Sequence, residues 1–275
     1  MSSRFTRVIP QAVTAAAAAV VVLILLVPGA IANGTSVPAP PAQPTSADQI
    51  QNVDQVKTAI KAYYGDTLTQ TLDPVNGTVQ LHTFSPSGAY ANEMAGIEAD
   101  AAKTLDKAAK HDKKFSGTPA VLFDIDDTTL NTYSYEIYSN FVFNPTTNAA
   151  FVNNAVFPAT PGMPALVSHA RDDGYTVFFL TGRPEAQRSG TVTNLQNAGY
   201  GTEDTDHLFL KNVSAPWLAS CTPTCTTTQY KSLTRQHIES LGYDIVANFG
   251  DQFSDLNGGF ADQTFKIPNP MYFLP

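Results

Sequence analysis

Five short apolar runs, separated by stretches with helical spacing, constrain the fold of this chain more than any other feature. The runs read as strands at 120–125, 176–180, 207–210, 245–249 and 264–267. Patterns typical of helices lie between them, at about 162–173, 184–198 and 228–241. Continuous apolar strands that alternate with helices indicate a parallel sheet covered on both faces. The predicted fold class is therefore α/β, a Rossmann-like doubly wound parallel sheet.

Carboxylates follow two of these strands, at the edge where such sheets bind ligands. Asp124 and Asp126 end the first strand in VLFDIDDTTL, and an extended backbone points both side chains to the same side. Asp251 and Asp255 follow the fourth strand in GDQFSD. Converging carboxylates raise one another's pKa unless a cation lies among them. A hard cation with few protein ligands is expected, which favours Mg²⁺ over Ca²⁺.

Groups suited to an anion lie at the same edge. Thr181 and the amide of Gly182 follow the second strand in LTGRP, where a predicted helix opens, and such a helix start binds anions. Lys231, in the first turn of the helix predicted at about 228–241, can reach the same place. Metal, anion cradle, lysine and a free carboxylate together indicate phosphoryl transfer, in which positioning and charge neutralisation supply most of the catalysis.

The N-terminus has the pattern of an export signal. Arg4 and Arg7 precede an apolar stretch at 12–27 and an A-x-A signal at 30–32, so we predict a secretory signal peptide at 1–32. An uncleaved membrane anchor is the alternative, although the stretch is short of the ~20 residues that a spanning helix needs. We therefore expect a secreted protein without stable membrane association once the signal is removed.

Composition and cysteine content indicate how the rest of the chain is organised. Residues 33–47 read as a flexible leader, 48–117 as an N-terminal helical segment and 118–275 as the core. Sixteen basic and 24 acidic residues give a formal charge of −8, which argues against a nucleic acid polymer as partner. Cys221 and Cys225 in CTPTC are expected to form a disulfide in an exported protein.

The motifs resemble those of one enzyme superfamily. The order DIDDT, LTGRP, YK and GDQFSD is similar to the four motifs of haloacid dehalogenase (HAD) superfamily phosphatases. Within it, VLFDIDDTTLNTYSY, GYTVFFLTGRP, YKSLTRQHIESLGYDIVANFGDQFSDL and the closing KIPNPMY resemble secreted acid phosphatases of classes B and C and related plant acid phosphatase-like proteins. The likeness covers about 118–275 and implies hydrolysis of small phosphate monoesters.

The resemblance also implies roles in catalysis. Asp124 would be the nucleophile that forms an aspartyl-phosphate, and Asp126 the general acid for the leaving alcohol and then the base for water. Thr181 and Lys231 would bind the phosphoryl oxygens, with the Gly182 amide beside them. Mg²⁺ would be held by the carboxylates of Asp124 and Asp251 and by the backbone carbonyl of Asp126. Asp255 would complete this metal-binding set by holding a metal-bound water or Lys231 in place. Thr128 would steady Asp126.

The family places a small helical cap at about 131–161, between the first two motifs. This stretch is rich in aromatic residues, for which ordinary packing between cap and core is the plainer interpretation. The alternative is that Tyr135 and Tyr138 stack on an aromatic leaving group such as a nucleoside. Asp127 reads as a solvated turn residue, Arg183 as a salt-bridge partner of its loop, and the histidines as surface or structural residues.

Other functions remain open at this point. The same site could transfer phosphate between alcohols or act as a 5'-nucleotidase. A receiver-like binding module shares the acidic pocket, threonine and lysine on a doubly wound sheet. Some plant relatives keep the scaffold as storage proteins without the nucleophile, which this chain retains as Asp124. An oligomer is compatible with the sequence.

Overall fold

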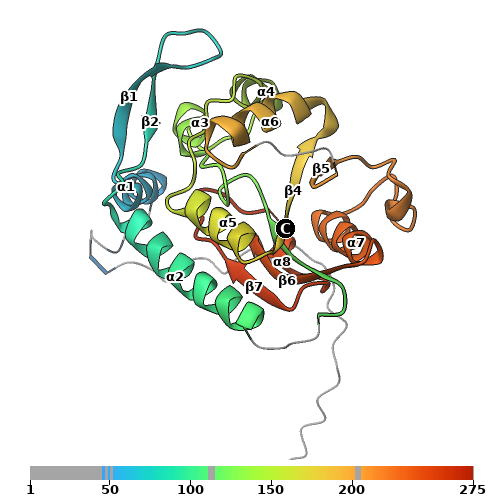
Figure 1. Ribbon diagram of the computed structural model, residues 1–275. Helices are drawn as coiled ribbons and strands as arrows, with labels where there is room; N and C mark the ends of the chain where they lie inside the picture. Colours follow the sequence, from blue (N-terminus) through green and yellow to red (C-terminus); the bar gives the residue numbers. More distant parts are fainter. Residues whose placement is uncertain (1–44, 47–48, 50–51, 111–114, 202–205, 275) are drawn as a thin grey trace, which may run out of the picture. The chain divides into compact units, whose positions relative to one another are not determined.

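The computed structural model describes residues 45–46, 49, 52–110, 115–201 and 206–274 (Figure 1). The predicted signal peptide and all of the predicted leader except residues 45 and 46 lie outside these residues. Among the described helices, none combines the length and apolar character needed to cross a membrane. The chain divides into units 1–50 and 51–275, and all elements named below belong to the second.

A five-stranded parallel sheet forms the centre of this unit and confirms the predicted fold class. Its strands are β3 (Thr118–Phe123), β4 (Thr176–Pro184), β5 (Leu208–Lys211), β6 (Tyr243–Gly250) and β7 (Gln263–Lys266). The order across the sheet is β5-β4-β3-β6-β7, and every neighbouring pair is parallel. The chain therefore leaves the central strand β3 in one direction and later returns to its other side. Such a reversal is where doubly wound sheets bind ligands.

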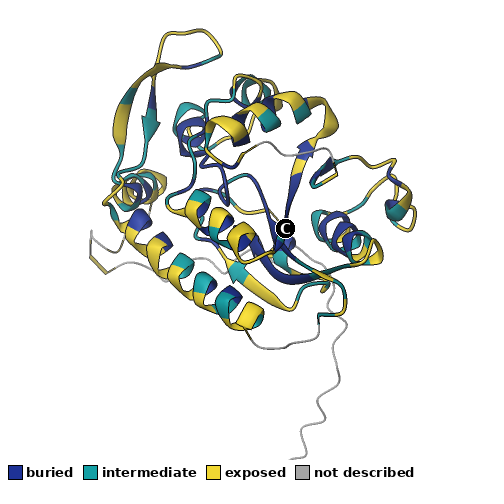
Figure 2. Cartoon of the chain, in the orientation of Figure 1, coloured by how far each residue is buried: buried dark blue, intermediate teal, exposed yellow. Residues whose placement is uncertain are grey.

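Successive residues of β3 face opposite sides of the sheet, as the pleat requires. Val121 and Phe123 belong to one buried cluster, whereas Ala120 and Leu122 belong to a second. The inner strands of the sheet, β3, β4 and β6, are buried over most of their length, as the dark strands of Figure 2 show. This explains why its strands read as unbroken apolar runs in the sequence.

Eight α-helices surround the strands in the described part of the chain. They are α1 (Val53–Tyr64), α2 (Ala89–Lys110), α3 (Tyr133–Tyr138), α4 (Pro145–Asn153), α5 (Met163–Asp172), α6 (Arg188–Asn197), α7 (Thr227–Ser240) and α8 (Phe253–Leu256). Short 3-10 helices occur at η2 (Glu185–Gln187) and η3 (Pro216–Leu218). Helix α7 begins with a capping box. The Thr226 hydroxyl accepts a hydrogen bond from the Gln229 backbone amide, and the Gln229 side-chain oxygen accepts one from the Thr226 backbone amide. Helices α3 and α4 lie where the cap was predicted.

The segment predicted as purely helical, 48–117, also contains a β-hairpin. Its strands are β1 (Thr67–Leu72) and β2 (Gln80–Thr83), paired antiparallel. Asp73 shapes the connecting loop, because its two carboxylate oxygens accept hydrogen bonds from four backbone amides. Burial works to raise the pKa of Asp73, but the four amide donors outweigh it and lower the pKa to about 2. The turn residues were visible in the sequence, but their flanking strands were missed.

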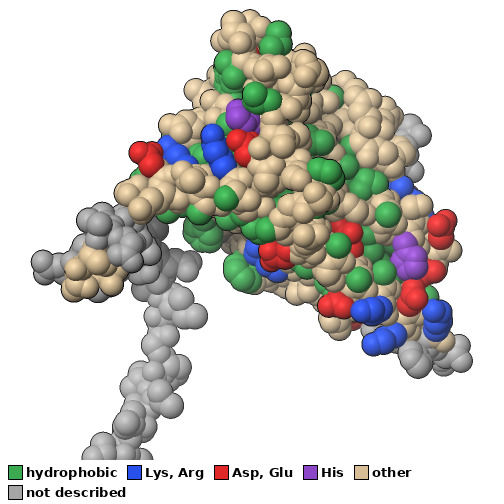
Figure 3. All heavy atoms as spheres, turned by 90° about the vertical axis from the view of Figure 1, so that its left-hand side faces the viewer, with side chains coloured by type: hydrophobic (Ala, Val, Ile, Leu, Met, Phe, Trp, Pro, Cys, Tyr) green, Lys and Arg blue, Asp and Glu red, His purple; other side chains and the backbone are tan. Residues whose placement is uncertain are grey.

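The hairpin presents apolar side chains to solvent. Four large ones are at least two-fifths exposed: Leu68, Leu72, Val75 and Val79. Figure 3 shows this face, with the hairpin at the top bearing apolar patches, and the hairpin strands and loop contain no Lys or Arg.

Glu98 on α2 is placed against the start of α5. Its carboxylate lies beside Gly162, where a Cβ would come within 1.7 Å of Oε2. Oε1 has no hydrogen-bond partner among the described residues, and burial raises the Glu98 pKa to about 7. Gly162 must therefore remain glycine for this half-buried carboxyl to fit.

Replacement Glu98→Gln should flatten the dependence of stability on pH. The folded pKa is raised above the unfolded value, so the stability linked to protonated Glu98 is complete below about pH 4.5 and is lost as pH rises through about 7. Melting temperatures at pH 5 and pH 8 should differ less in Glu98→Gln than in the wild type. Asp100→Asn, an exposed change on the same helix, is the control. Equal slopes for wild type and Glu98→Gln would contradict this assignment.

Candidate active site

The predicted polar edge is formed by the ends of three adjacent strands. Phe123 of β3 lies in register with Phe179 of β4 and Phe249 of β6. The residues that follow must therefore meet, and the Asp124 amide donates to the Phe249 carbonyl at 2.9 Å. The arrangement confirms the expectation that these strand ends converge.

A buried ion pair joins Asp124 to Lys231. The Lys231 ammonium, on the second turn of α7, donates to Oδ1 of Asp124 and to the Leu180 carbonyl at 2.6 Å. It also lies 3.1 Å from Oδ1 of Asp255. Both charged side chains of the pair are under one-tenth exposed. The geometry leaves the ammonium with three oxygen partners and fixes the orientation of the Asp124 carboxylate.

Three buried carboxylates gather around this ammonium. Asp124, Asp251 and Asp255 each place one oxygen within 4.8 Å of the other two. Gly250 makes this approach possible, because a Cβ there would lie 2.4 Å from the Asp255 Cβ. The Asp255 carboxylate is in turn held by the Gln252 amide at 2.9 Å.

The electrostatics of the cluster show an excess of negative charge. Burial raises the pKa of Asp124 to about 8, opposed by Lys231 and reinforced by Asp255. Burial and the charge of Asp255 likewise raise the pKa of Asp251 far above its usual range. Burial alone would lower the Lys231 pKa, but the two neighbouring carboxylates outweigh it and raise the pKa. One ammonium among three carboxylates leaves room for a divalent cation, and oxygen donors fit a hard one.

Asp126 points to a different partner. Its carboxylate is held by Arg183, with Nε 3.0 Å from Oδ2 and the terminal guanidinium nitrogen 2.6 Å from Oδ1. Arg183 also donates to the Thr191 hydroxyl at 3.1 Å. The predicted salt bridge of Arg183 is thus present. The carboxylate of Asp126 lies outside the three-carboxylate group, so its predicted backbone contact with a metal stays a prediction.

The predicted anion cradle has a different backbone from the one expected. Residues 181–184 continue β4, and α6 begins only at Arg188 after the turn η2. Gly182 therefore lies exposed in a strand end and not at a helix start, which corrects the sequence interpretation. Thr181 is fully buried at the same edge, and its hydroxyl accepts from the Arg183 amide at 3.1 Å. Thr181 remains next to Leu180, the carbonyl partner of Lys231.

Two residues beside Asp126 behave differently from prediction. Asp127 was expected to be solvated but is fully buried, with a left-handed backbone at φ 56°. Its carboxylate accepts from the amide of Thr132 at 3.0 Å and from the hydroxyls of Thr132 and Tyr272. The Thr128 hydroxyl makes no hydrogen bond to any described residue, so its predicted support of Asp126 is wrong.

The aromatic residues of the cap mainly pack against one another. Tyr135 is 1% exposed; its hydroxyl exchanges hydrogen bonds with the Asn144 backbone, and its ring centroid lies 5.3 Å from that of Phe151. This corrects the prediction of Tyr135 as a substrate-stacking residue. Tyr138 is half-buried with its ring 5.1 Å from Phe151, and its contact with substrate stays a prediction. Glu136, between them, is buried, and burial raises its pKa to about 8.

Sequence reasoning missed the residues that hold Asp251. Gln252 and Asn269 both donate side-chain hydrogen bonds to its Oδ2, at 2.6 and 2.7 Å. Asn269 belongs to KIPNPMY, which was noted only for its resemblance to known sequences. A polar residue shortly after the last strand was the available signal, because that strand ends at the same edge of the sheet.

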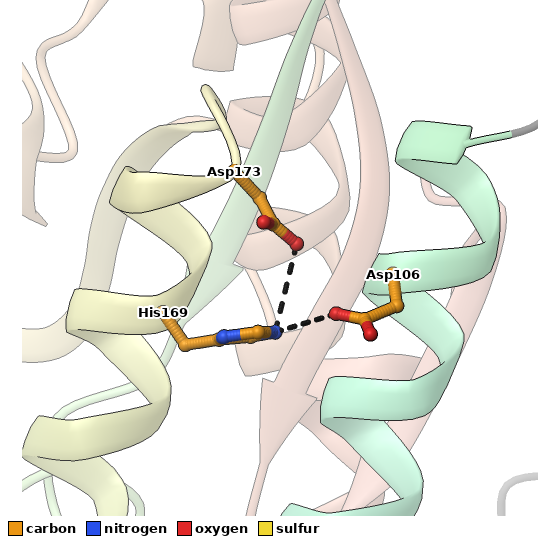
Figure 4. A group of neighbouring side chains, drawn as sticks. All are labelled: Asp106, His169 and Asp173. Atoms are coloured by element: carbon orange, nitrogen blue, oxygen red, sulfur yellow. Dashed lines mark hydrogen bonds and ion pairs between the residues drawn. The ribbon is translucent and has the colours of Figure 1, made fainter.

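A second group of ionisable residues lies between α2 and α5 (Figure 4). His169 Nε2 is 2.8 Å from Asp106 Oδ1 and 3.5 Å from Asp173 Oδ2. All three are partly exposed, and the Lys110 ammonium neutralises Asp106 at 3.1 Å. The contacts are those of an ion-pair network between two helices, which agrees with a structural role for His169.

Comparison with known proteins decides the family. A family model described as HAD superfamily, subfamily IIIB (Acid phosphatase), matches residues 76–275. The chain belongs to this family. Acid phosphatase 1 of Solanum lycopersicum is 35% identical over 187 residues, which cover 65% of this chain and 70% of that protein. Vegetative storage protein 2 of Arabidopsis thaliana is 30% identical over 158 residues, 56% of each chain.

Solved structures agree on the fold. The class C acid phosphatase from Bacillus anthracis superposes with a TM-score of 0.53 at 22% identity, covering 66% of this chain and 80% of that one. Its tungstate-bound form gives a TM-score of 0.54 with the same identity. The family match and the Solanum lycopersicum relative identify the chain as a phosphomonoesterase of the acid phosphatase type.

Replacement Lys231→Met should strongly destabilise the metal-free protein. It leaves the three buried carboxylates without their ammonium, and breaking a buried pair in this way costs about 3–5 kcal/mol of unfolding free energy. The loss, measured by denaturant titration near pH 8, should shrink at lower pH as the carboxylates protonate. Lys103→Met, which breaks an exposed pair with Asp100, should cost about 0–1 kcal/mol. A loss no larger than that of this control would show that Lys231 does not offset the charge of the buried carboxylates.

Proposed function

We propose that this protein is an exported, Mg²⁺-dependent acid phosphatase that hydrolyses small phosphate monoesters through an aspartyl-phosphate at Asp124. The observation that carries the proposal is the buried Asp124 carboxylate, oriented by Lys231 within a group of three acids. Lys231 occupies one oxygen of Asp124, so the nucleophile is preset and does not rotate freely.

In the first half-reaction, an oxygen of Asp124 attacks phosphorus while the bond from phosphorus to the leaving oxygen breaks. Lys231 and Thr181, both buried at the strand ends, would hold the phosphoryl oxygens. Asp126 would give its proton to the leaving oxygen, so that an alcohol and not an alkoxide departs. In the structure the Asp126 oxygens contact the Arg183 guanidinium, so Asp126 has to leave this partner and carry a proton before it can serve as the acid.

In the second half-reaction, water attacks phosphorus of the aspartyl-phosphate. Asp126, now deprotonated, would take the proton of this water. The bond between phosphorus and the Asp124 oxygen breaks, which releases inorganic phosphate and restores the carboxylate. One residue thus serves as acid and then as base, and each cycle ends with both aspartates in their starting states.

Asp124 and Asp251, with the backbone carbonyl of Asp126, would hold the Mg²⁺ ion, and Asp255 would stay with Lys231. Once bound, the ion neutralises negative charge on the phosphoryl oxygens and on the cluster itself. The raised pKa of Asp251 and the surplus of carboxylates over ammonium groups support this assignment.

Export is proposed from two independent features. The predicted signal peptide at 1–32 directs the chain to the secretory route. The predicted disulfide between Cys221 and Cys225 is formed, and such bonds persist in oxidising compartments. The acidic net charge is consistent with a small substrate held at one local positive site and not with a nucleic acid polymer.

Storage is the alternative that the relatives raise, since two of them are named vegetative storage proteins. The intact pairing of Asp124 with Lys231 favours the enzyme. Phosphotransfer to an alcohol would use the same residues with an alcohol in place of water, and added nucleosides or sugars would become phosphorylated. A receiver-like module lacks an acid/base such as Asp126 beside the nucleophile.

Hydrolysis of p-nitrophenyl phosphate should depend on both a divalent ion and Asp124. Activity is expected to vanish in EDTA and to return when Mg²⁺ is added in excess, because the cluster needs a cation to accept a phosphate dianion. Asp124→Asn should remain folded and inactive under both conditions. Full activity in chelator would reject the metal role, and turnover by Asp124→Asn would reject the nucleophile.

Replacement Asp126→Asn should slow turnover by about 10²–10⁴. The loss should be larger for alkyl phosphates than for p-nitrophenyl phosphate, whose leaving group needs less protonation. The measurement is kcat across a series of leaving groups of graded pKa. An equal loss for all of them would show that Asp126 does not protonate the leaving oxygen.

A further inference from the structure

The C-terminal segment, residues 267–274, returns from the last strand to the acid cluster. The Ile267 amide donates to the Gly250 carbonyl at 2.9 Å, immediately before Asp251. Further along, the Ser254 hydroxyl donates to the Leu274 carbonyl at 3.4 Å. The segment is thus attached at one end to the last residue of β6 and at the other end to helix α8.

Asn269 is fixed in one orientation within this segment. The Met271 backbone amide can only donate, and it lies 2.9 Å from Oδ1 of Asn269. Oδ1 must therefore be the acceptor, and the amide nitrogen faces Asp251 Oδ2 at 2.7 Å as a donor. No other assignment of the side-chain amide satisfies both contacts.

Gln252 is oriented by the same segment. The Leu274 backbone amide donates to its Oε1 at 3.0 Å, so Nε2 must face Asp251. Both donors to Oδ2 of Asp251 are consequently set by backbone amides of the C-terminal segment. Oδ1 of Asp251 accepts no hydrogen bond from the described residues, which leaves this oxygen free to bind a cation.

Tyr272 reaches a second strand-end loop. Its hydroxyl donates to Asp127 Oδ2 at 2.8 Å, and Asp127 in turn binds the amide and hydroxyl of Thr132. The loop held in this way begins at Asp124 and contains Asp126. Hydrogen bonds around a ligand carboxylate or a catalytic loop fix its geometry, and their loss typically costs 10–100-fold in metal affinity or activity.

We propose that Asn269 and Tyr272 are positioning residues of the active site. Asn269 presents Asp251 to the divalent cation, and Tyr272 holds the loop that carries Asp124 and Asp126. The last eight residues described in this chain thereby tie two strand ends into one catalytic geometry. The inference rests on the proposed function, since it assigns these residues to its metal ligand and its reacting loop.

Asn269→Ala tests the first role through metal binding alone. Calorimetric titration of metal-free protein with MgCl₂ should give a dissociation constant 10–100-fold weaker than that of the wild type. The melting temperature in EDTA reports whether the variant is folded. Asn257→Ala, an exposed asparagine near the site, should bind Mg²⁺ like the wild type. An unchanged constant for folded Asn269→Ala would overturn its role.

Tyr272→Phe removes one hydroxyl and keeps the ring. It therefore tests the positioning proposal even if Asn269→Ala does not fold. The dissociation constant for Mg²⁺ and KM should stay within about twofold of the wild-type values. In contrast, kcat should fall about tenfold, as expected for losing a hydrogen bond to a charged group. A merely structural role would lower the melting temperature and leave kcat unchanged, and that result would overturn the proposal.

Failure of the proposed function can be told apart from failure of the positioning roles. If the wild type neither binds Mg²⁺ nor hydrolyses p-nitrophenyl phosphate, the proposed function fails. If the wild type does both, and the Asn269 and Tyr272 variants match it, only the positioning roles fail.

Discussion

The active site depends on one buried ion pair, between the Lys231 ammonium and the Asp124 carboxylate. A buried carboxylate, such as Asp124 after the buried end of β3, is costly unless a positive charge accompanies it. Helix α7 brings that charge from 107 residues further along the chain, and the same ammonium reaches Asp255. The pair thus holds a helix, two strand-end loops and the proposed nucleophile in one arrangement.

The remaining negative charge gives the site its chemistry. Asp251 and Asp255 add two carboxylates to a pocket with a single ammonium, so the cluster favours a divalent cation or a proton. Asp126, held apart by Arg183, is the acid that does not join this group. Asp124 and Asp126 therefore have different partners, in keeping with the different roles proposed for them.

The sheet, and the edge at which the proposed site residues meet, could be predicted from the sequence because the relevant patterns are local. Apolar runs identify β3, β4 and β6, and parallel strands bring Asp124, Thr181 and Asp251 to one edge. The backbone at Gly182 was mispredicted, since strand β4 extends further than its apolar run. The buried setting of Asp127 could not be foreseen, because one of its hydrogen-bond partners, Tyr272, lies 145 residues away. Contacts of that range have no periodic signature.

We propose that a divalent ion lies among the carboxylates beside Lys231. Crystals grown with Mn²⁺ in place of Mg²⁺ would locate such an ion by its anomalous scattering. One strong peak is expected in contact with oxygens of Asp124 and Asp251. An absence of density there, or a peak only at His169 between Asp106 and Asp173, would contradict it.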